Sequence, residues 1–228
     1  MFYDPTYIFV IIGALISMIA SINVKLTFNK YSHVVNSRGV RAHEVAETIL
    51  HSSGIYDVKI EKVEGNLTDH YSPTDKILRL STRVYNSESV AAIGVAAHEC
   101  GHAIQHNTGY APLRLRSLAV PVVNIGSRLS WPLIIIGLVL GSLGLAKTGV
   151  ILFFLVVLFQ LITLPIEFNA SRRALSILNN QTLLVDDELT GARKVLIAAA
   201  LTYVAALFSS ILQMLRLLVL VNNRNNRR

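Results

Sequence analysis

Two histidines and a glutamate lie close together in the middle of the chain, in the sequence His98-Glu99-Cys100-Gly101-His102. On an α-helix His98 and His102 are about 40° apart around the axis and one turn apart along it, so both imidazoles can reach one metal ion. Glu99 is about 60° from His102, close enough to contact a metal-bound water without binding the metal. Two ligands and one general base on one helix are the arrangement of a zinc hydrolase.

The residues that flank this pattern favour a metal site over an accidental match. Val90 to Ala97 are apolar and small, which indicates a buried helix, and Asn86 or Ser87 is expected to cap it. Three polar side chains on one side of a buried helix need partners, and a metal ion would supply them. Gly101 leaves a gap beside the ligand face, through which another helix could approach closely. The alternative is a solvated helix face with two surface histidines.

Two further patterns are not expected to bind the metal. His106 continues the four-residue spacing, but it lies about 12 Å from His98 along the helix axis, which is too far for one ion. The stretch from His43 to Glu47 has a glutamate in place of the second histidine, and its flanks are polar. We expect it on the solvated face of an amphipathic helix over Ser37–Ser53.

The composition indicates an integral membrane protein with one modest polar part. Of 228 residues, 52% are hydrophobic and only 15% are charged, whereas soluble domains carry about 25% charged residues. The net charge of +7 fits the bias of basic residues toward the cytoplasmic side of a membrane better than it fits nucleic-acid binding, for which no motif is present. The single cysteine excludes an internal disulfide and fits a reducing compartment.

Long apolar runs predict the membrane segments. Tyr7–Val24 is long enough to span, and basic residues follow it rather than precede it. We therefore expect a retained anchor with its N-terminus outside, not a cleaved signal peptide. Ala111–Arg128 predicts an interfacial helix bent at a proline. Leu129–Ala146 and Val150–Leu164 predict a transmembrane hairpin with a tight turn at Lys147–Gly149.

Two short segments predict a small β-sheet beside the metal-binding helix. Val58–Val63 alternates apolar and polar residues, and Ile77–Ser81 follows a turn. An edge strand near Ile77–Ser81 could hold an extended substrate by backbone pairing. His70 and Tyr71 lie between the two strands, in an expected loop that either is structural or lines the cleft.

A carboxylate after the hairpin could complete the metal site. Pro165 is expected to end the second span, and Glu167 follows at the membrane exit, where a charge is costly without a partner. The orientation rule places Glu167 on the side of the polar part, where it is the natural third ligand. The alternative is a glutamate that stabilises a helix start. A long apolar helix over Leu189–Val221 comes next, and the sequence leaves the side of its tail open.

With these motifs the chain resembles the YugP-like membrane zinc metallopeptidases of bacteria. The resemblance rests on His98–His102 and Glu167–Arg173, with further matches at Asp69–Pro73, Gly109–Ser117 and Ser130–Leu133, and it covers nearly the whole chain. More distantly the chain resembles the HtpX-type membrane proteases, whose second motif is Glu-x-x-x-Asp.

The more distant resemblance implies roles for two residues after the hairpin. Glu167 matches the glutamate that is the third zinc ligand in the HtpX-type proteases. Ser171 stands where those proteases have an aspartate that supports a ligand histidine, and a hydroxyl would be a weaker partner than a carboxylate.

These features together predict a mainly α membrane protein. It has a zincin-like helical metalloprotease core, a small β-sheet and a transmembrane hairpin. The expected parts form one integrated domain: an N-terminal membrane anchor (1–30), a cytoplasmic part with the metal-binding helix (31–116), the hairpin (117–166), and the third-ligand helix with the C-terminal apolar helix (167–228).

The predicted function is a zinc-dependent endopeptidase of the bacterial cytoplasmic membrane, with its site on the cytoplasmic side and with peptides or membrane proteins as substrates. Zinc would be held by His98, His102 and Glu167, and Glu99 would be the general base. The candidates for an oxyanion donor or a supporting contact are Ser171, Arg173, Tyr203 and His70. The alternative function is a catalytically inactive membrane scaffold stabilised by zinc. No nucleic-acid partner is expected, and the oligomeric state is open.

Overall fold

The computed structural model describes residues 4–225, and the chain divides into two compact units. One unit consists of Met1–Ser21, Leu115–Leu164 and Leu201–Arg228. The other consists of Ile22–Arg114 and Pro165–Ala200, and it contains the predicted metal ligands and the general base.

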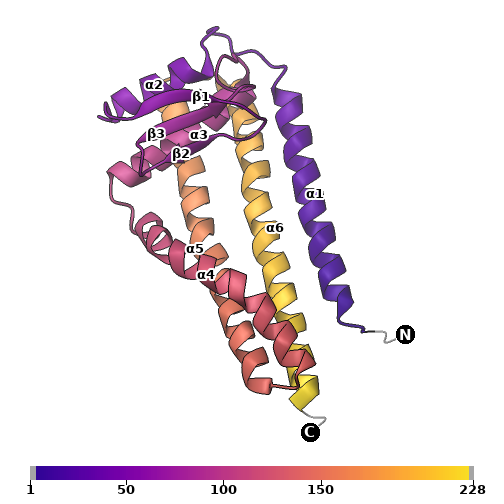
Figure 1. Cartoon of the computed structure of the whole chain (residues 1–228). Helices are drawn as coiled ribbons and strands as arrows, with labels where there is room; N and C mark the ends of the chain where they lie inside the picture. Colours follow the sequence, from indigo (N-terminus) through magenta and orange to yellow (C-terminus); the bar gives the residue numbers. More distant parts are fainter. Residues whose placement is uncertain (1–3, 226–228) are drawn as a thin grey trace. The chain divides into compact units, whose positions relative to one another are not determined.

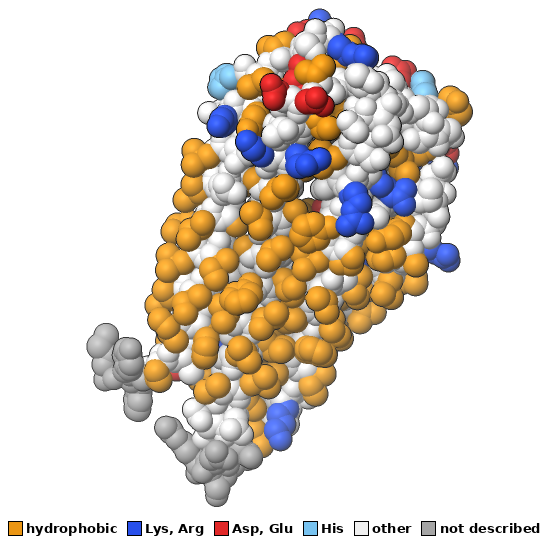
Figure 2. Space-filling model, turned by 180° about the vertical axis from the view of Figure 1, so that it is seen from behind, with side chains coloured by type: hydrophobic (Ala, Val, Ile, Leu, Met, Phe, Trp, Pro, Cys, Tyr) orange, Lys and Arg blue, Asp and Glu red, His pale blue; other side chains and the backbone are white. Residues whose placement is uncertain are grey.

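Long apolar helices account for most of the chain. Within residues 4–225, the helices long and apolar enough to cross a membrane are α1 (Tyr7–Tyr31), α4 (Ala111–Val139), α5 (Leu143–Asn180) and α6 (Asp186–Asn225). Hydrophobic side chains cover much of the visible surface of the long helices (Figure 2). In the most apolar 18-residue window of α1, only 11% of the residues are buried inside the protein. So large an exposed apolar surface is typical of helices in lipid, and the predicted mainly α membrane class is confirmed.

The segment predicted as an interfacial helix is not a separate element. Ala111–Arg128 and the first predicted span, as far as Val139, form one continuous helix, α4, with Pro121 and Pro132 inside it. Pro165 likewise lies inside α5, although we expected it to end the span. A helix in lipid has no water to satisfy freed backbone groups, so it tends to continue through a proline where a soluble helix would end.

The turn of the hairpin also lies earlier than predicted. α4 ends at Val139 and α5 begins at Leu143, so the predicted turn residues Lys147–Gly149 are inside α5. Gly141 lies in the actual turn with a φ of 73°, a left-handed conformation that glycine adopts without strain. Gly149 instead allows close helix packing, because an ideal Cβ there would lie 2.7 Å from the backbone oxygen of Ser130 on α4.

The sheet belongs to the unit that contains the candidate site, and it has three strands. β1 (Lys59–Val63) and β3 (Ile77–Ser81) confirm the two predicted strands, and β2 (His70–Ser72) is a third. The order is β1-β3-β2, with β1 parallel and β2 antiparallel to β3. The prediction of an edge strand near Ile77–Ser81 is therefore wrong, because β3 is central. His70 and Tyr71 lie in a strand rather than a loop, and three residues are too few to show an alternating pattern.

Two helices pack beside this sheet (Figure 1): α2 (Ala42–Ser52) and α3 (Val90–Asn107). Small and β-branched residues of α3 form a shared core with the apolar face of α2, the start of α6 and the end of α5. Ser89 caps α3, and its Oγ accepts a hydrogen bond from the Ala92 N–H at 3.2 Å. The cap is thus Ser89, not the predicted Asn86 or Ser87, and Ser87 Oγ instead bonds to Ser89.

Candidate metal centre

Both histidines of the pattern lie on one face of α3. Their rings are 4.7 Å apart between centroids and nearly perpendicular, at 84°. The side chains of His98 and His102 are 15% and 14% exposed, so they are largely shielded from water but still accessible. The four-residue spacing therefore places both imidazoles side by side on one face of the helix, as predicted.

Gly101 brings α5 against this helix. An ideal Cβ at Gly101 would lie 2.6 Å from the backbone oxygen of Ala170, closer than real Cβ atoms come. Only glycine therefore permits the observed approach of the two backbones, as the gap beside the ligand face suggested. Ala170 and Ala174 are also small and fully buried on α5, which keeps this helix close to α3. Glu167 lies one turn before Ala170, on the part of α5 that faces the histidines.

The third predicted ligand reaches both imidazoles. Glu167 Oε2 lies 3.3 Å from His98 Nε2 and 3.6 Å from His102 Nε2. The ligand atoms of these three residues all lie within 4.8 Å of one another, and among the described residues they form the one cluster of this kind. Glu167 is only 3% exposed, yet its Oε2 has no hydrogen-bond partner among the described groups.

These distances fit a zinc ion. Ligands held about 2.0–2.1 Å from a tetrahedral metal stand about 3.3 Å from one another, close to the separations of Glu167 Oε2 from the two Nε2 atoms. A buried carboxylate oxygen without a hydrogen bond is costly unless a cation accepts its charge. Two imidazoles and one carboxylate are also a donor set that zinc commonly binds at catalytic sites.

A chain of hydrogen bonds fixes which nitrogen of His102 carries the proton. Arg173 Nε donates to Asn169 Oδ1 at 2.8 Å, so this Asn169 atom is an acceptor. Gln105 Nε2 donates to the same oxygen at 3.0 Å and to the Ile166 carbonyl at 2.8 Å. Gln105 Oε1 must then accept from His102 Nδ1, 3.0 Å away. The lone pair of His102 is consequently on Nε2, the nitrogen that faces Glu167.

His98, on α3, has a simpler partner on α5. Ser171 Oγ lies 3.1 Å from His98 Nδ1, so both ligand histidines are engaged through the nitrogen remote from Glu167. Contacts of this kind orient metal-binding imidazoles. Sequence reasoning predicted the place of Ser171 but gave no role to Gln105 or Asn169. The sequence did contain one indication of the contact between Gln105 and His102: Gln105 follows His102 by three residues and so lies on the same helical face.

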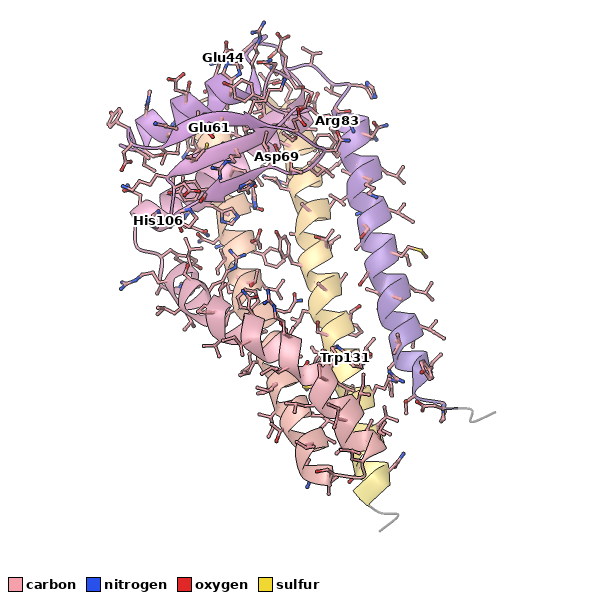
Figure 3. The ribbon with its side chains drawn as sticks, in the orientation of Figure 1. Glu44, Glu61, Asp69, Arg83, His106 and Trp131 are labelled. Carbon is pink, nitrogen blue, oxygen red and sulfur yellow. The ribbon has the colours of Figure 1, made fainter. Side chains whose placement is uncertain are left out.

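Glu99, a residue of α3, is hydrogen-bonded to the sheet. The residue is 8% exposed, and its Oε2 accepts a hydrogen bond from the Tyr71 backbone N–H of β2 at 3.0 Å. Asp69, immediately before β2 (Figure 3), accepts from the Ser81 N–H at 2.7 Å and from Ser81 Oγ at 3.0 Å, which ties the start of β2 to the end of β3. Burial raises the pKa of Asp69 above its usual value, and the nearby Glu99 charge raises it further.

The other predicted residues are not members of the cluster of three ligands. His70 is exposed, and its Nδ1 lies 2.8 Å from the Thr68 carbonyl oxygen. His106, near the end of α3 (Figure 3), bonds through Nδ1 to the Tyr71 hydroxyl at 2.8 Å and is not part of the cluster. Arg173 contributes through Asn169, as described above. Tyr203 lies on α6 in the other unit.

Comparison with known proteins agrees with this chemistry. Residues 6–222 match the family described as "Putative neutral zinc metallopeptidase". The chain is also 48% identical over 221 residues to a Bacillus subtilis (strain 168) protein named "Putative membrane protease YugP", a match that covers 96% of the chain and 98% of that protein. No solved structure gave a significant match. The resemblance predicted from the sequence is confirmed, and the chain belongs to the family described as "Putative neutral zinc metallopeptidase".

Proposed function

We propose that this chain is a zinc-dependent endopeptidase of the cell membrane. The observation that carries the proposal is the convergence of His98 Nε2, His102 Nε2 and Glu167 Oε2, with a general base next to the first histidine. Zinc bound by these three atoms would keep one position open, lower the pKa of a bound water to about 7 and polarise a substrate carbonyl.

The chain's own groups would carry the proton. Glu99 Oε2 is held by the Tyr71 N–H, while its other oxygen forms no hydrogen bond with a described residue. That free oxygen is suited to accept a proton from water and to deliver it later to the leaving amine. The Tyr71 contact fixes the direction of the carboxylate, so Glu99 need not be reorganised before each proton transfer.

The free edge of β2 is the part of the sheet suited to align a peptide. β2 is one of the two edges of the sheet, and because its Tyr71 N–H is already bonded to Glu99, a peptide would pair with the other backbone groups of this edge. An extended peptide that paired with this edge would lie along α3, next to the histidines. This proposal replaces the predicted alignment along Ile77–Ser81, which is the central strand.

We place the site on the cytoplasmic side, with membrane-protein segments or peptides as substrates. Lys25 and Lys30 follow the apolar part of α1, which favours a cytoplasmic location for the residues after it. Substrates embedded in or emerging from the bilayer would be within reach of a site on a membrane-anchored chain.

The test compares wild type with Glu99→Gln in the full chain, purified in detergent. Zinc content is measured by elemental analysis, and cleavage is measured with casein and a quenched fluorescent peptide. We expect one zinc per chain in both proteins and a loss of activity on the order of 10²–10⁴-fold in the variant.

Glu47→Gln is the matched control, because Glu47 is an exposed glutamate on α2, and it should retain full activity. Equal cleavage by wild type and Glu99→Gln would refute the base role. Zinc-loaded wild type without activity would favour the scaffold alternative.

A further inference from the structure

A cavity lies between the end of α1 and the first turns of α6. Its volume is about 290 Å³, and it lies wholly within the unit that contains the candidate metal centre. Four polar side chains line it: Asn23, Thr27, Lys30 and Lys194. The first three recur at intervals of four and three residues, so they form one face of α1, and Lys194 faces them from α6. No aspartate or glutamate lines the cavity.

Within residues 4–225, these four polar side chains have no hydrogen-bond or ion-pair partners. Among the described residues none forms an ion pair or a side-chain hydrogen bond with Asn23, Thr27, Lys30 or Lys194, and Lys30 has only a ring contact, 5.6 Å from the centroid of Tyr31. Asn23, Lys30 and Lys194 are exposed, so their polar groups are open to a ligand. Two ammonium groups facing one cavity without a carboxylate between them favour an anion.

The apolar surroundings indicate what kind of anion. Ile22 and Leu26 on α1 and Ile197 on α6 are 49%, 66% and 53% exposed, so large hydrophobic side chains surround the cationic cavity on both helices. Ile197 also lines the cavity itself. The apolar run of α1 ends, and that of α6 begins, at these residues, which places the cavity at the boundary between hydrocarbon and headgroups. A ligand with a phosphate next to acyl chains matches both parts of this surface.

Close packing between α1 and α6 fixes the walls of the cavity. An ideal Cβ at Gly191 would lie 2.8 Å from Tyr31 Cδ1, so glycine lets the Tyr31 ring rest directly against α6. Tyr31 and the small, buried Ala198 then form walls of the cavity, one from each helix. The two lysines are thus presented by helices already fixed to each other, and binding a ligand would require little rearrangement.

We propose that this cavity binds the headgroup of an anionic phospholipid such as phosphatidylglycerol. Lys30 and Lys194 contact the phosphate, Asn23 and Thr27 bond to the glycerol oxygens, and the exposed apolar side chains contact the acyl chains. The proposal does not depend on the metal centre or on proteolysis.

The test measures lipid binding by the full chain in detergent, with native mass spectrometry and a titration of short-chain phosphatidylglycerol. Phosphatidylcholine and inorganic phosphate serve as the comparison ligands. Wild type should bind phosphatidylglycerol at least ten-fold more tightly than either. Lys30→Gln with Lys194→Gln should weaken phosphatidylglycerol binding on the order of ten- to thirty-fold. The matched control is Lys25→Gln with Arg193→Gln, which removes the same charge at neighbouring positions that do not line the cavity. It should change the affinity less than about three-fold.

Several results would overturn the proposal. Equal loss of affinity in the two double variants would mean that the lipid is attracted by the overall positive charge and not by this cavity. Equal binding of phosphatidylcholine would mean that the site does not distinguish an anionic lipid from a zwitterionic one. Phosphate binding as tight as lipid binding would identify a free-anion site. Thr27→Leu is a second test variant, because it partly fills the cavity and leaves its charge unchanged. It should also weaken phosphatidylglycerol binding by at least five-fold. Unchanged binding there would place the lipid elsewhere.

Discussion

The contact between Gly101 and Ala170 gives the sharpest test of how the metal centre is assembled. In Gly101→Ala the new methyl group would lie 2.6 Å from the Ala170 backbone oxygen, whereas ordinary contact begins at 3.4 Å. The helices must therefore separate by about 0.8 Å at this point, since neither backbone can yield locally. Metal–ligand distances tolerate only about 0.2 Å, so Glu167 on α5 would be withdrawn from the two histidines on α3. We expect zinc affinity to fall at least on the order of 100-fold, with an overpacking cost of about 1–3 kcal/mol in stability.

The assay is a chelator competition for zinc on the purified variant, combined with thermal unfolding. Gly94→Ala is the matched control, because Gly94 lies on the same helix but an ideal Cβ there would be 3.3 Å from the side chain of Ala192. Both variants gain about 1 kcal/mol of helix propensity, so any difference between them reports the contact with the facing helix. Gly94→Ala should bind zinc like wild type. Wild-type zinc affinity in Gly101→Ala would show that the close approach of α3 and α5 is not needed to position the ligands.

Substitutions at two positions of α5, Glu167 and Ser171, test the ligand set from the other helix. Glu167→Gln should abolish the stabilisation by zinc, which in wild type should reach about 4 kcal/mol at a zinc concentration 1,000 times Kd; unfolding by denaturant with and without zinc measures this, and an undiminished gain would exclude Glu167 as a ligand. Ser171→Ala should weaken zinc binding about 10-fold by freeing the His98 ring, whereas Ser171→Asp should strengthen it, because a carboxylate holds an imidazole N–H better than a hydroxyl does. Zinc titration would show this order, and equal affinities in the two variants would contradict it.

Local patterns predicted the regular elements well and their limits less well. β1 and β3 and the long apolar helices were recognisable because periodicity and length are properties of a single segment. β2 was missed because three residues carry no period. Pro165 and Gly149 were interpreted as a helix end and a turn, since the sequence does not reveal that lipid and a facing helix favour continuation.

The sequence by itself determined the pair of histidines and the adjacent glutamate, because one helix of fixed pitch sets their relative positions. It gave Glu167 as the third ligand only through its place after a span and through resemblance. Tertiary structure decided the rest. The approach of α5 at Gly101 brings Glu167 Oε2 to 3.3 Å from His98 Nε2. The bonds of Gln105 to Asn169 and to the Ile166 carbonyl fix the proton on His102. The physical reason is that distances between segments far apart in the chain depend on side-chain packing and hydrogen bonding across an interface, which no local pattern records.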